Sequence, residues 1–117
     1  HHDIISRFPK NTFILHCCGK TTDRIAFFAE AGFPVYHFES KNNIFEALKA
    51  AGDMALTGCV NNPETLLFGT PEDVHASVEN ILREGIRLIS PECAIPLQVR
   101  NENLLQISRA VRAWHTV

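Results

Sequence analysis

The chain alternates between two hydrophobic patterns. Short runs of apolar, strand-forming residues are each followed by a segment whose apolar residues lie three or four positions apart, the spacing of an amphipathic helix. The predicted strands cover residues 12–16, 34–39, 54–60 and 87–93. The predicted helices cover residues 1–8, 21–33, 42–53, 70–86 and 101–114, and a short helical turn is expected at residues 62–69.

This order of strands and helices predicts an α/β fold with a parallel sheet. Strands that are separated by helical segments of about 10 to 15 residues are joined by right-handed crossovers. Four such strand–helix units are half of an eight-stranded TIM (β/α)8 barrel. A doubly wound sheet is the alternative, but the glycine-rich first turn of a dinucleotide-binding fold is absent from the sequence.

Helix-starting residues precede two of the predicted helices. Thr70 is a candidate N-cap, Pro71 occupies the first helical position, and Glu72 and Asp73 would lie in the first turn. Thr21 begins a Thr-x-Asp sequence and is the second candidate N-cap. The sequence therefore predicts the first residue of both helices.

Composition narrows the class of protein. The chain has 117 residues, 45% hydrophobic and 21% charged, with a formal net charge of -2. These values are ordinary for a globular domain, and the slight negative charge gives no basic stripe for binding nucleic acid. No apolar run approaches the roughly 20 residues that a membrane span needs, and no signal-peptide pattern opens the chain. A soluble, cytoplasmic protein is expected.

The four cysteines are expected to be free thiols. Cys17 and Cys18 are adjacent, whereas Cys59 and Cys93 each lie singly on an apolar segment. A disulfide framework is typical of small secreted chains with cysteines in their loops, which this pattern does not resemble. Free thiols, some of them metal ligands, are the better interpretation.

Metal-ligating residue types gather where the predicted strands end. In a parallel sheet or barrel, functional groups collect at the carboxyl ends of the strands. Side chains alternate between faces along a strand, so His16 and Cys18 share a face and Cys17 points away. With Glu39 after the second strand and Cys93 after the fourth, one imidazole, two thiols and one carboxylate can converge.

That donor set suits zinc. Zinc takes tetrahedral sets of thiolate, imidazole and carboxylate ligands, and a displaceable carboxylate would leave a position for substrate. A thiol bound there would lose its proton near neutral pH and become a nucleophile. The residues alone leave open that Cys18 and Cys93 are simply buried core cysteines. His37 is expected to be a hydrogen-bonded strand histidine rather than a ligand.

Three stretches resemble a known superfamily. "LHCCGKTTDRIAFFAEAGFPVYHFESKNN", "TGCVNNPETLLFGTPEDVHASVENILREGI" and "ISPECAIP" are similar to the uroporphyrinogen decarboxylase superfamily, in its methylcobamide:coenzyme M methyltransferase branch. The likeness runs from about Asp3 to Trp114 and corresponds to the C-terminal half of that family's TIM barrel. It implies that residues 1–117 are a single partial domain. The rest of the barrel would then come from a missing N-terminal half or from a second copy of the chain.

The resemblance also implies a function and site residues. "LLFGTPEDV" is shared by the whole superfamily, whereas His-x-Cys with a distant Cys, here His16, Cys18 and Cys93, marks the zinc-binding methyltransferases. A more remote likeness to cobalamin-independent methionine synthase implies that Glu39, 21 residues after Cys18, is the zinc ligand that thiol displaces. Relatives carry Gly-Asn after the third strand, and Asn61 or Asn62 would take that asparagine's place in binding substrate or cofactor.

The implied enzyme is a zinc-dependent methyltransferase that moves a methyl group from a methyl-corrinoid (methylcobamide) to a thiol such as coenzyme M. Its partners would be a corrinoid protein or free cobamide and the small thiol, with no catalytic residue beyond the metal site. Two alternatives remain open at this point. One is a uroporphyrinogen decarboxylase-like tetrapyrrole enzyme without zinc, and the other is a non-catalytic corrinoid- or metal-binding half-barrel module.

Overall fold

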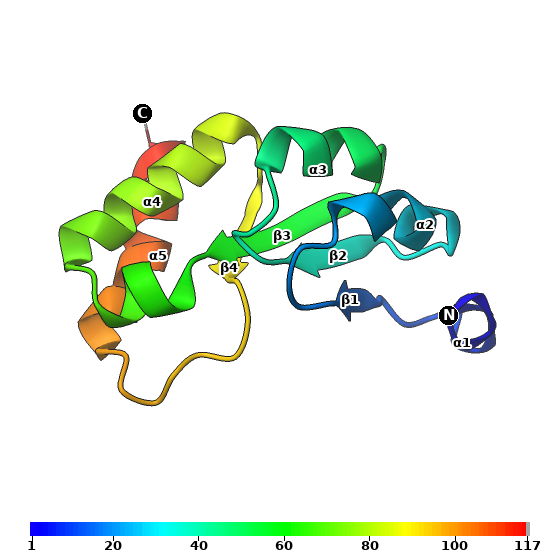
Figure 1. The fold of residues 1–117 in the computed structure, drawn as a ribbon, viewed down its shortest axis with the longest axis horizontal. Helices are drawn as coiled ribbons and strands as arrows, with labels where there is room; N and C mark the ends of the chain where they lie inside the picture. Colours follow the sequence, from blue (N-terminus) through cyan, green and yellow to red (C-terminus); the bar gives the residue numbers. More distant parts are fainter. Residues whose placement is uncertain (117) are drawn as a thin grey trace.

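The computed structural model describes residues 1–116, which contain one four-stranded sheet with the order β1-β2-β3-β4 (Figure 1). Its strands are β1 (Ile14–His16), β2 (Val35–Phe38), β3 (Ala55–Val60) and β4 (Leu88–Pro91). All three neighbouring pairs are parallel. The predicted α/β fold of four parallel strand–helix units is confirmed. The carboxyl ends of the strands therefore meet at one edge of the sheet.

One helix precedes β1, and helical segments follow each of the four strands. They are α1 (His2–Arg7), the 3₁₀ turn η1 (Thr22–Arg24), α2 (Ile25–Glu30), α3 (Ile44–Ala51), the π-helical turn η2 (Asn62–Leu67), α4 (Pro71–Glu84) and α5 (Asn101–His115). Helices α2, α3 and α4 cover one face of the sheet, and α5 packs against α4 (Figure 1). The short α1 lies beyond β1 and has no buried residue.

The hydrophobic core lies between the sheet and this helical layer. Tyr36 and Phe38 of β2 are fully buried against it, together with Val60 of β3. The opposite face of the sheet carries no helix, and Ile14 and Leu88 are 59% and 50% exposed. The sheet is thus covered on one face and open on the other.

Glycine is needed where β2 approaches β3. Gly58 pairs with Phe38 and has φ +135°, a conformation that residues with a Cβ rarely adopt. A Cβ built at this position would collide with the Phe38 carbonyl oxygen. The close pairing of the two strands next to their carboxyl ends therefore depends on the missing side chain.

The predicted helix starts have different outcomes. Thr70 caps α4 as predicted: its hydroxyl accepts from Asp73 N–H, and the Asp73 carboxylate accepts from Thr70 N–H. Thr21 occupies the predicted N-cap position, before η1, but its side chain makes no cap hydrogen bond. Thr21 is instead fully buried, with its hydroxyl 2.6 Å from the Tyr36 hydroxyl. A long-range partner has replaced the local cap.

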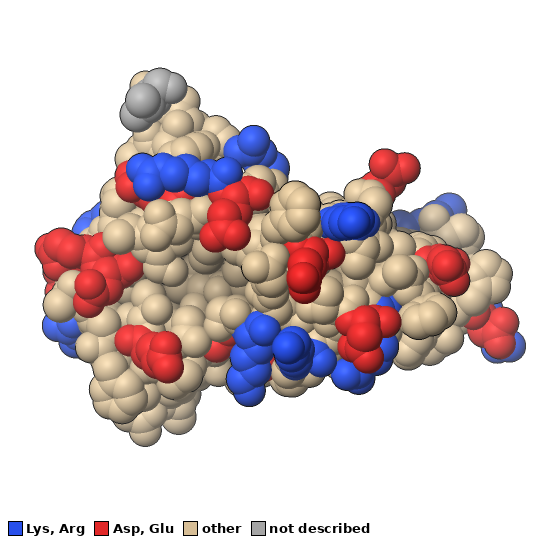
Figure 2. All heavy atoms as spheres, turned by 45° about the horizontal axis from the view of Figure 1, so that its top comes forward, with Lys and Arg blue, Asp and Glu red and all other residues tan. Residues whose placement is uncertain are grey.

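Two further features concern the length of the helices and the distribution of charged side chains. Within residues 1–116, no helix combines the length and the apolar character needed to cross a bilayer. Figure 2 shows the helix-covered face, where acidic and basic side chains are interspersed rather than gathered by sign.

Candidate metal centre

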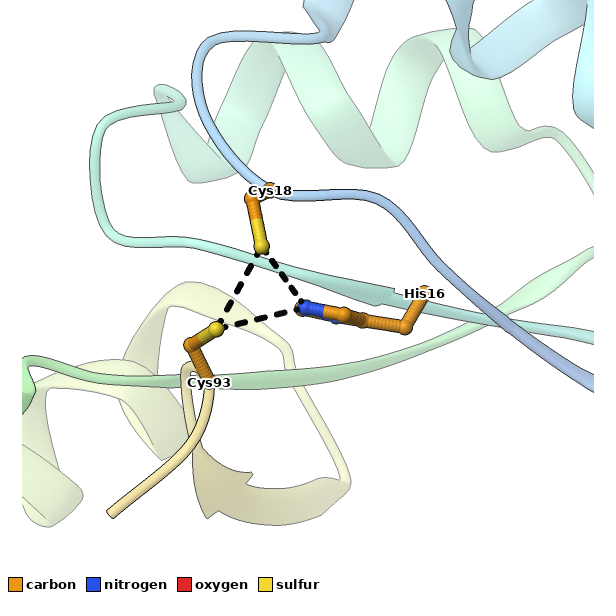
Figure 3. Close-up of side chains that lie close together, drawn as sticks. All are labelled: His16, Cys18 and Cys93. Atoms are coloured by element: carbon orange, nitrogen blue, oxygen red, sulfur yellow. Dashed lines mark hydrogen bonds between the residues drawn. The ribbon is translucent and has the colours of Figure 1, made fainter. Parts of the chain in front are cut away.

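Three potential metal ligands meet at the carboxyl edge of the sheet (Figure 3). His16 Nε2 lies 3.2 Å from Cys18 Sγ, Cys18 Sγ lies 3.3 Å from Cys93 Sγ, and Cys93 Sγ lies 3.5 Å from His16 Nε2. The three donor atoms are all within 4.8 Å of one another. They come from the first and the last strand of the sheet, which are separated by β2 and β3.

This convergence involves the residues beyond the strand ends as well as the sheet. Strands that are three places apart lie about 14 Å from each other in a flat sheet. Cys18 and Cys93 each lie two residues beyond the end of their strand, and the His16 side chain contacts both thiols. The path of the two segments that follow β1 and β4 therefore helps to bring His16 to Cys93.

The alternation of side chains along β1 separates the two adjacent cysteines. Cys18 is exposed beside His16, whereas Cys17 is half-buried and packs against the core. The Tyr36 hydroxyl donates to the Cys17 carbonyl oxygen at 3.2 Å, which holds this segment against β2. All four cysteines are free thiols, as expected.

The His16 ring is oriented for metal binding through Nε2. Its Nδ1 lies 3.2 Å from the His37 carbonyl oxygen, which can only accept, so Nδ1 carries the proton. The Nε2 lone pair then points at the two thiols. Metal-binding histidines usually donate their second ring N–H to such a carbonyl or carboxylate.

His37 is a hydrogen-bonded strand histidine, as predicted. Its Nε2–H donates to the Pro91 carbonyl oxygen at 2.7 Å, and its ring centroid is 4.6 Å from that of His16. This bond spans β3 on the open face and ties β2 to the end of β4. His37 supports the cluster and is not among the three donors.

The fourth predicted ligand is close to the cluster but outside it. Glu39 follows β2 and is nearly buried, and the atoms within 4.8 Å of one another do not include its carboxylate. Its influence is seen on Cys18, whose pKa is raised to about 11. The hydrogen bond with Cys93 is the largest cause, followed by desolvation and by the negative charges of Cys93 and Glu39.

The donor set fits a zinc ion. An imidazole nitrogen and two thiol sulfurs lie together, and a carboxylate is near enough to interact with one of the sulfurs. Without a cation, the hydrogen bond with Cys93 and, after it, desolvation and the nearby negative charges raise the pKa of Cys18 and keep it protonated. A cation would favour both thiolates. Two thiolates, one imidazole and an adjacent carboxylate match the ligands that zinc prefers.

A cavity of about 740 Å³ adjoins the cluster, and its walls include Glu39, Cys93, Asn61 and Asn62. The Asn61 side chain accepts from Glu64 N–H and donates to the Ser40 hydroxyl. Asn62 is 4% exposed, and its Nδ2 donates to the Ala94 carbonyl oxygen. Asn62 Oδ1 is buried without a hydrogen-bond partner. Both predicted binding residues thus lie at the cavity, with part of their bonding capacity already engaged in the fold.

The fourth cysteine has no place in the cluster. Cys59 is buried between α3 and α4, beside Ile44 and Ile81. Burial, and after it the negative charges of Glu84 and Glu92, raise the pKa of its thiol to about 12. Cys59 is therefore an unreactive residue of the helix-covered side.

Sequence reasoning missed Glu92, which directly precedes Cys93. Its carboxylate is buried and accepts hydrogen bonds from Ser40 and Asn62, the residues that follow β2 and β3. The available signal was a carboxylate on an apolar segment next to a candidate ligand. Without the fold, nothing indicated that its partners would be these two residues.

Comparison with known proteins gives consistent results. The profile of the family described as uroporphyrinogen decarboxylase (URO-D) matches residues 1–114. Methylcobamide:CoM methyltransferase MtbA of Methanosarcina acetivorans is 29% identical over 101 residues, covering 86% of this chain and 30% of that protein. The Methanosarcina mazei MtbA is 28% identical over the same shares.

A third relative and one solved structure extend this result. The methylated-thiol–coenzyme M methyltransferase of Methanosarcina mazei is 22% identical over 99 residues. A solved methyltransferase from Methanosarcina mazei superposes with a TM-score of 0.87 at 24% identity, over 97% of this chain and 35% of that one. The chain therefore spans about a third of the length of the relatives it matches.

Proposed function

The chain belongs to the uroporphyrinogen decarboxylase family, and from this premise we propose that it supplies the zinc site of a corrinoid-dependent thiol methyltransferase. The reaction would move a methyl group from a methyl-corrinoid to a thiol such as coenzyme M. The observation that carries the proposal is the convergence of His16, Cys18 and Cys93 within 4.8 Å. The relatives named as methylcobamide:CoM methyltransferases support it.

His16, Cys18 and Cys93 would hold the zinc ion, and Glu39 would be the fourth ligand, displaced by the substrate thiol. When bound, zinc supplies the positive charge that lowers the pKa of a thiol into the neutral range. The chain's own part is to present the ligands. The His37 carbonyl oxygen keeps the His16 Nδ1 proton in place, so that Nε2 stays available.

The cavity beside Cys93 and Glu39 would receive the body of the thiol, with Asn61 and Asn62 in its wall. The methyl-corrinoid, free or on a corrinoid protein, would approach the same carboxyl edge. A sulfur–carbon bond forms as the cobalt–carbon bond breaks, the electron pair of that bond stays on the corrinoid, and the thiol proton leaves to solvent. No general base is required from the chain.

The proposal treats residues 1–117 as a partial domain, corresponding to the C-terminal half of a uroporphyrinogen decarboxylase-like barrel. The superposition on 35% of a methyltransferase chain supports the partial domain. The uncovered face of the sheet, where Ile14 and Leu88 are exposed, also supports it. The other strand–helix units would complete the wall around the substrates.

The test is zinc binding by the reduced chain, purified without metal-affinity steps and dialysed against buffered zinc. We expect about one zinc per folded chain and none in the His16→Ala/Cys18→Ala variant. Cys59→Ala is the matched control. This cysteine lies on the other face of the sheet, so its substitution should leave the amount of bound zinc unchanged. A folded, reduced wild-type chain that binds no zinc would overturn the proposal in favour of a zinc-free decarboxylase-like protein.

Methyl transfer is tested next, with methylcobalamin and coenzyme M, by following the absorbance change as the corrinoid loses its methyl group. Turnover that disappears in the His16→Ala/Cys18→Ala variant is the expected result. Zinc binding with no turnover, even when the missing N-terminal half of the barrel is supplied, would contradict the assignment of activity and would favour a metal-binding module.

A further inference from the structure

The carboxylate of Glu92 links the ends of three strands. Glu92 is 7% exposed and lies between the last residue of β4 and Cys93. One carboxylate oxygen accepts from Ser40 N–H at 2.8 Å and from the Ser40 hydroxyl. The other oxygen accepts from Asn62 N–H at 3.1 Å. The backbone N–H of Glu92 donates to the Val60 carbonyl oxygen at 3.0 Å, which prolongs the pairing with β3.

This position calls for a carboxylate rather than an amide. All three side-chain contacts are donors, and they are divided between both oxygens of Glu92. A glutamine offers one accepting oxygen and one donating NH₂ group, so one of the donors would face another donor. Charge-assisted bonds to a buried carboxylate are stronger than neutral ones, and their loss leaves buried groups unsatisfied.

The partners of Glu92 are adjacent to the candidate ligands. Ser40 directly follows Glu39, so its two bonds to Glu92 tie the Glu39 segment to the Cys93 segment. Asn62 holds Cys93 from both sides, because its backbone N–H binds Glu92 and its Nδ2 binds the Ala94 carbonyl oxygen. The Cys93 segment is therefore fixed immediately before and immediately after the thiol.

We propose that Glu92 is a positioning residue of the metal centre, whose buried carboxylate holds Cys93 beside His16 and Cys18 and sets the place of Glu39. This inference rests on the proposed metal site. Glu92 is not itself a ligand, since its oxygens are engaged by Ser40 and Asn62. Its effect on a bound metal passes through the Cys93 thiolate.

Cobalt(II) titration of the reduced chain tests the proposal. Cobalt(II) is a spectroscopic substitute for zinc, and its near-ultraviolet charge-transfer absorption scales with the number of thiolate ligands. In Glu92→Gln we expect cobalt affinity to fall by about 10- to 100-fold, the usual cost of losing a residue that orients a ligand. We also expect a weaker charge-transfer band at saturation, because Cys93 leaves the metal.

Glu64→Gln is the matched control, because Glu64 lines the same cavity but its carboxylate takes no part in the Ser40–Glu92–Asn62 network. It should keep the wild-type affinity and spectrum. Glu92→Asp keeps two accepting oxygens and should recover part of the thiolate absorption. Ser40→Ala removes one donor and keeps the other, so it should shift affinity in the same direction by less.

Several results would overturn the proposal. If Glu92→Gln lowers the melting temperature but binds cobalt with wild-type affinity and absorption, Glu92 supports the fold alone. If Glu92→Gln does not fold, a Ser40→Ala variant with unchanged cobalt affinity has the same meaning. A wild-type chain without thiolate-to-cobalt absorption would instead refute the metal site itself, and with it the proposed function.

Discussion

The helix-covered face and the open face of the sheet use the same strands for different purposes. On β2, Tyr36 and Phe38 are fully buried under the helices, while Val35 and His37 on the open side are only half-buried. The covered face gains its stability from apolar burial. The open face instead arranges polar groups through hydrogen bonds between strands, such as that from His37 to Pro91.

The cysteine thiols also differ between the covered face and the open face. Cys59 is buried among apolar side chains of the covered side, and its pKa is raised to about 12. Cys18 is exposed at the carboxyl edge, next to an imidazole and a second thiol. One residue type is therefore inert packing on one face and a candidate metal ligand on the other. Location in the fold, rather than residue type, separates these two roles.

The largest expected effect is on the covered face. Phe38→Ala should reduce the free energy of unfolding by about 3–5 kcal/mol, because a large buried side chain is replaced by a cavity. Val35→Ala, on the open side of the same strand, should cost about 1 kcal/mol, since its side chain is only partly removed from water. Urea unfolding measures both. Equal losses would mean that the two faces contribute alike to stability.

The next effect separates the two kinds of thiol. Cys18→Ser should weaken zinc binding by more than about 100-fold, beyond the effect of a residue that only orients a ligand, and should leave the urea midpoint unchanged. Cys59→Ser should do the reverse: it keeps zinc affinity and lowers stability by about 1–3 kcal/mol, because a hydroxyl is buried among apolar groups. Zinc competition titrations and urea unfolding of both variants check this. Loss of zinc in Cys59→Ser would contradict the comparison.

Metal binding at the open face should depend on pH. The pKa of Cys18 is raised to about 11, so at neutral pH this thiol is protonated and must release its proton when it binds a metal. Apparent zinc affinity should therefore rise between pH 6 and 8, by up to about tenfold per pH unit for each proton released. Competition titrations at three pH values measure the slope. A flat profile would show that metal binding does not displace thiol protons.

The smallest effect concerns the cap of α4, in the helical layer and away from the cluster. Thr70→Ala should cost about 1 kcal/mol of unfolding free energy and leave zinc affinity unchanged.

The backbone and side-chain hydrogen bonds of Thr70 lower the pKa of Asp73. The contribution of Asp73 is thus complete above the ordinary aspartate pKa and is lost as the pH falls through the lowered value. The Thr70 backbone N–H still binds Asp73 in the alanine variant, so urea unfolding at decreasing pH should show the difference shrinking only by the part due to the Thr70 side chain.

Much of the fold could be predicted because its signals are local. Period-two and period-3.6 hydrophobicity locate the strands and helices, and Thr70 with Asp73 marks the start of α4. The absence of a side-chain cap bond at Thr21 could not be predicted in this way. The Thr21 hydroxyl can bond either to a neighbouring N–H or to the distant Tyr36 hydroxyl, and only the packed core favours the second partner.

The candidate site also has one part that local sequence predicts and one part that only the fold decides. Strand alternation put His16 and Cys18 on one side and Cys17 on the other, because this relation involves only neighbours in the chain. That Cys93 would reach them depended on how the segments after β1 and β4 meet across two intervening strands. The distance of the Glu39 carboxylate from the three donors depended on where β2 ends.

The sequence by itself determined the order of strands and helices, the parallel sheet they form and the residue types at its carboxyl edge. These follow from local hydrophobic period, turn residues and side-chain alternation, which act over a few residues. The tertiary structure alone decided that His16 and Cys93 meet across two intervening strands and that Glu92 joins Ser40 to Asn62. Such contacts arise from the twist of the paired strands and from the need of buried polar groups to find partners, and both are properties of the assembled core.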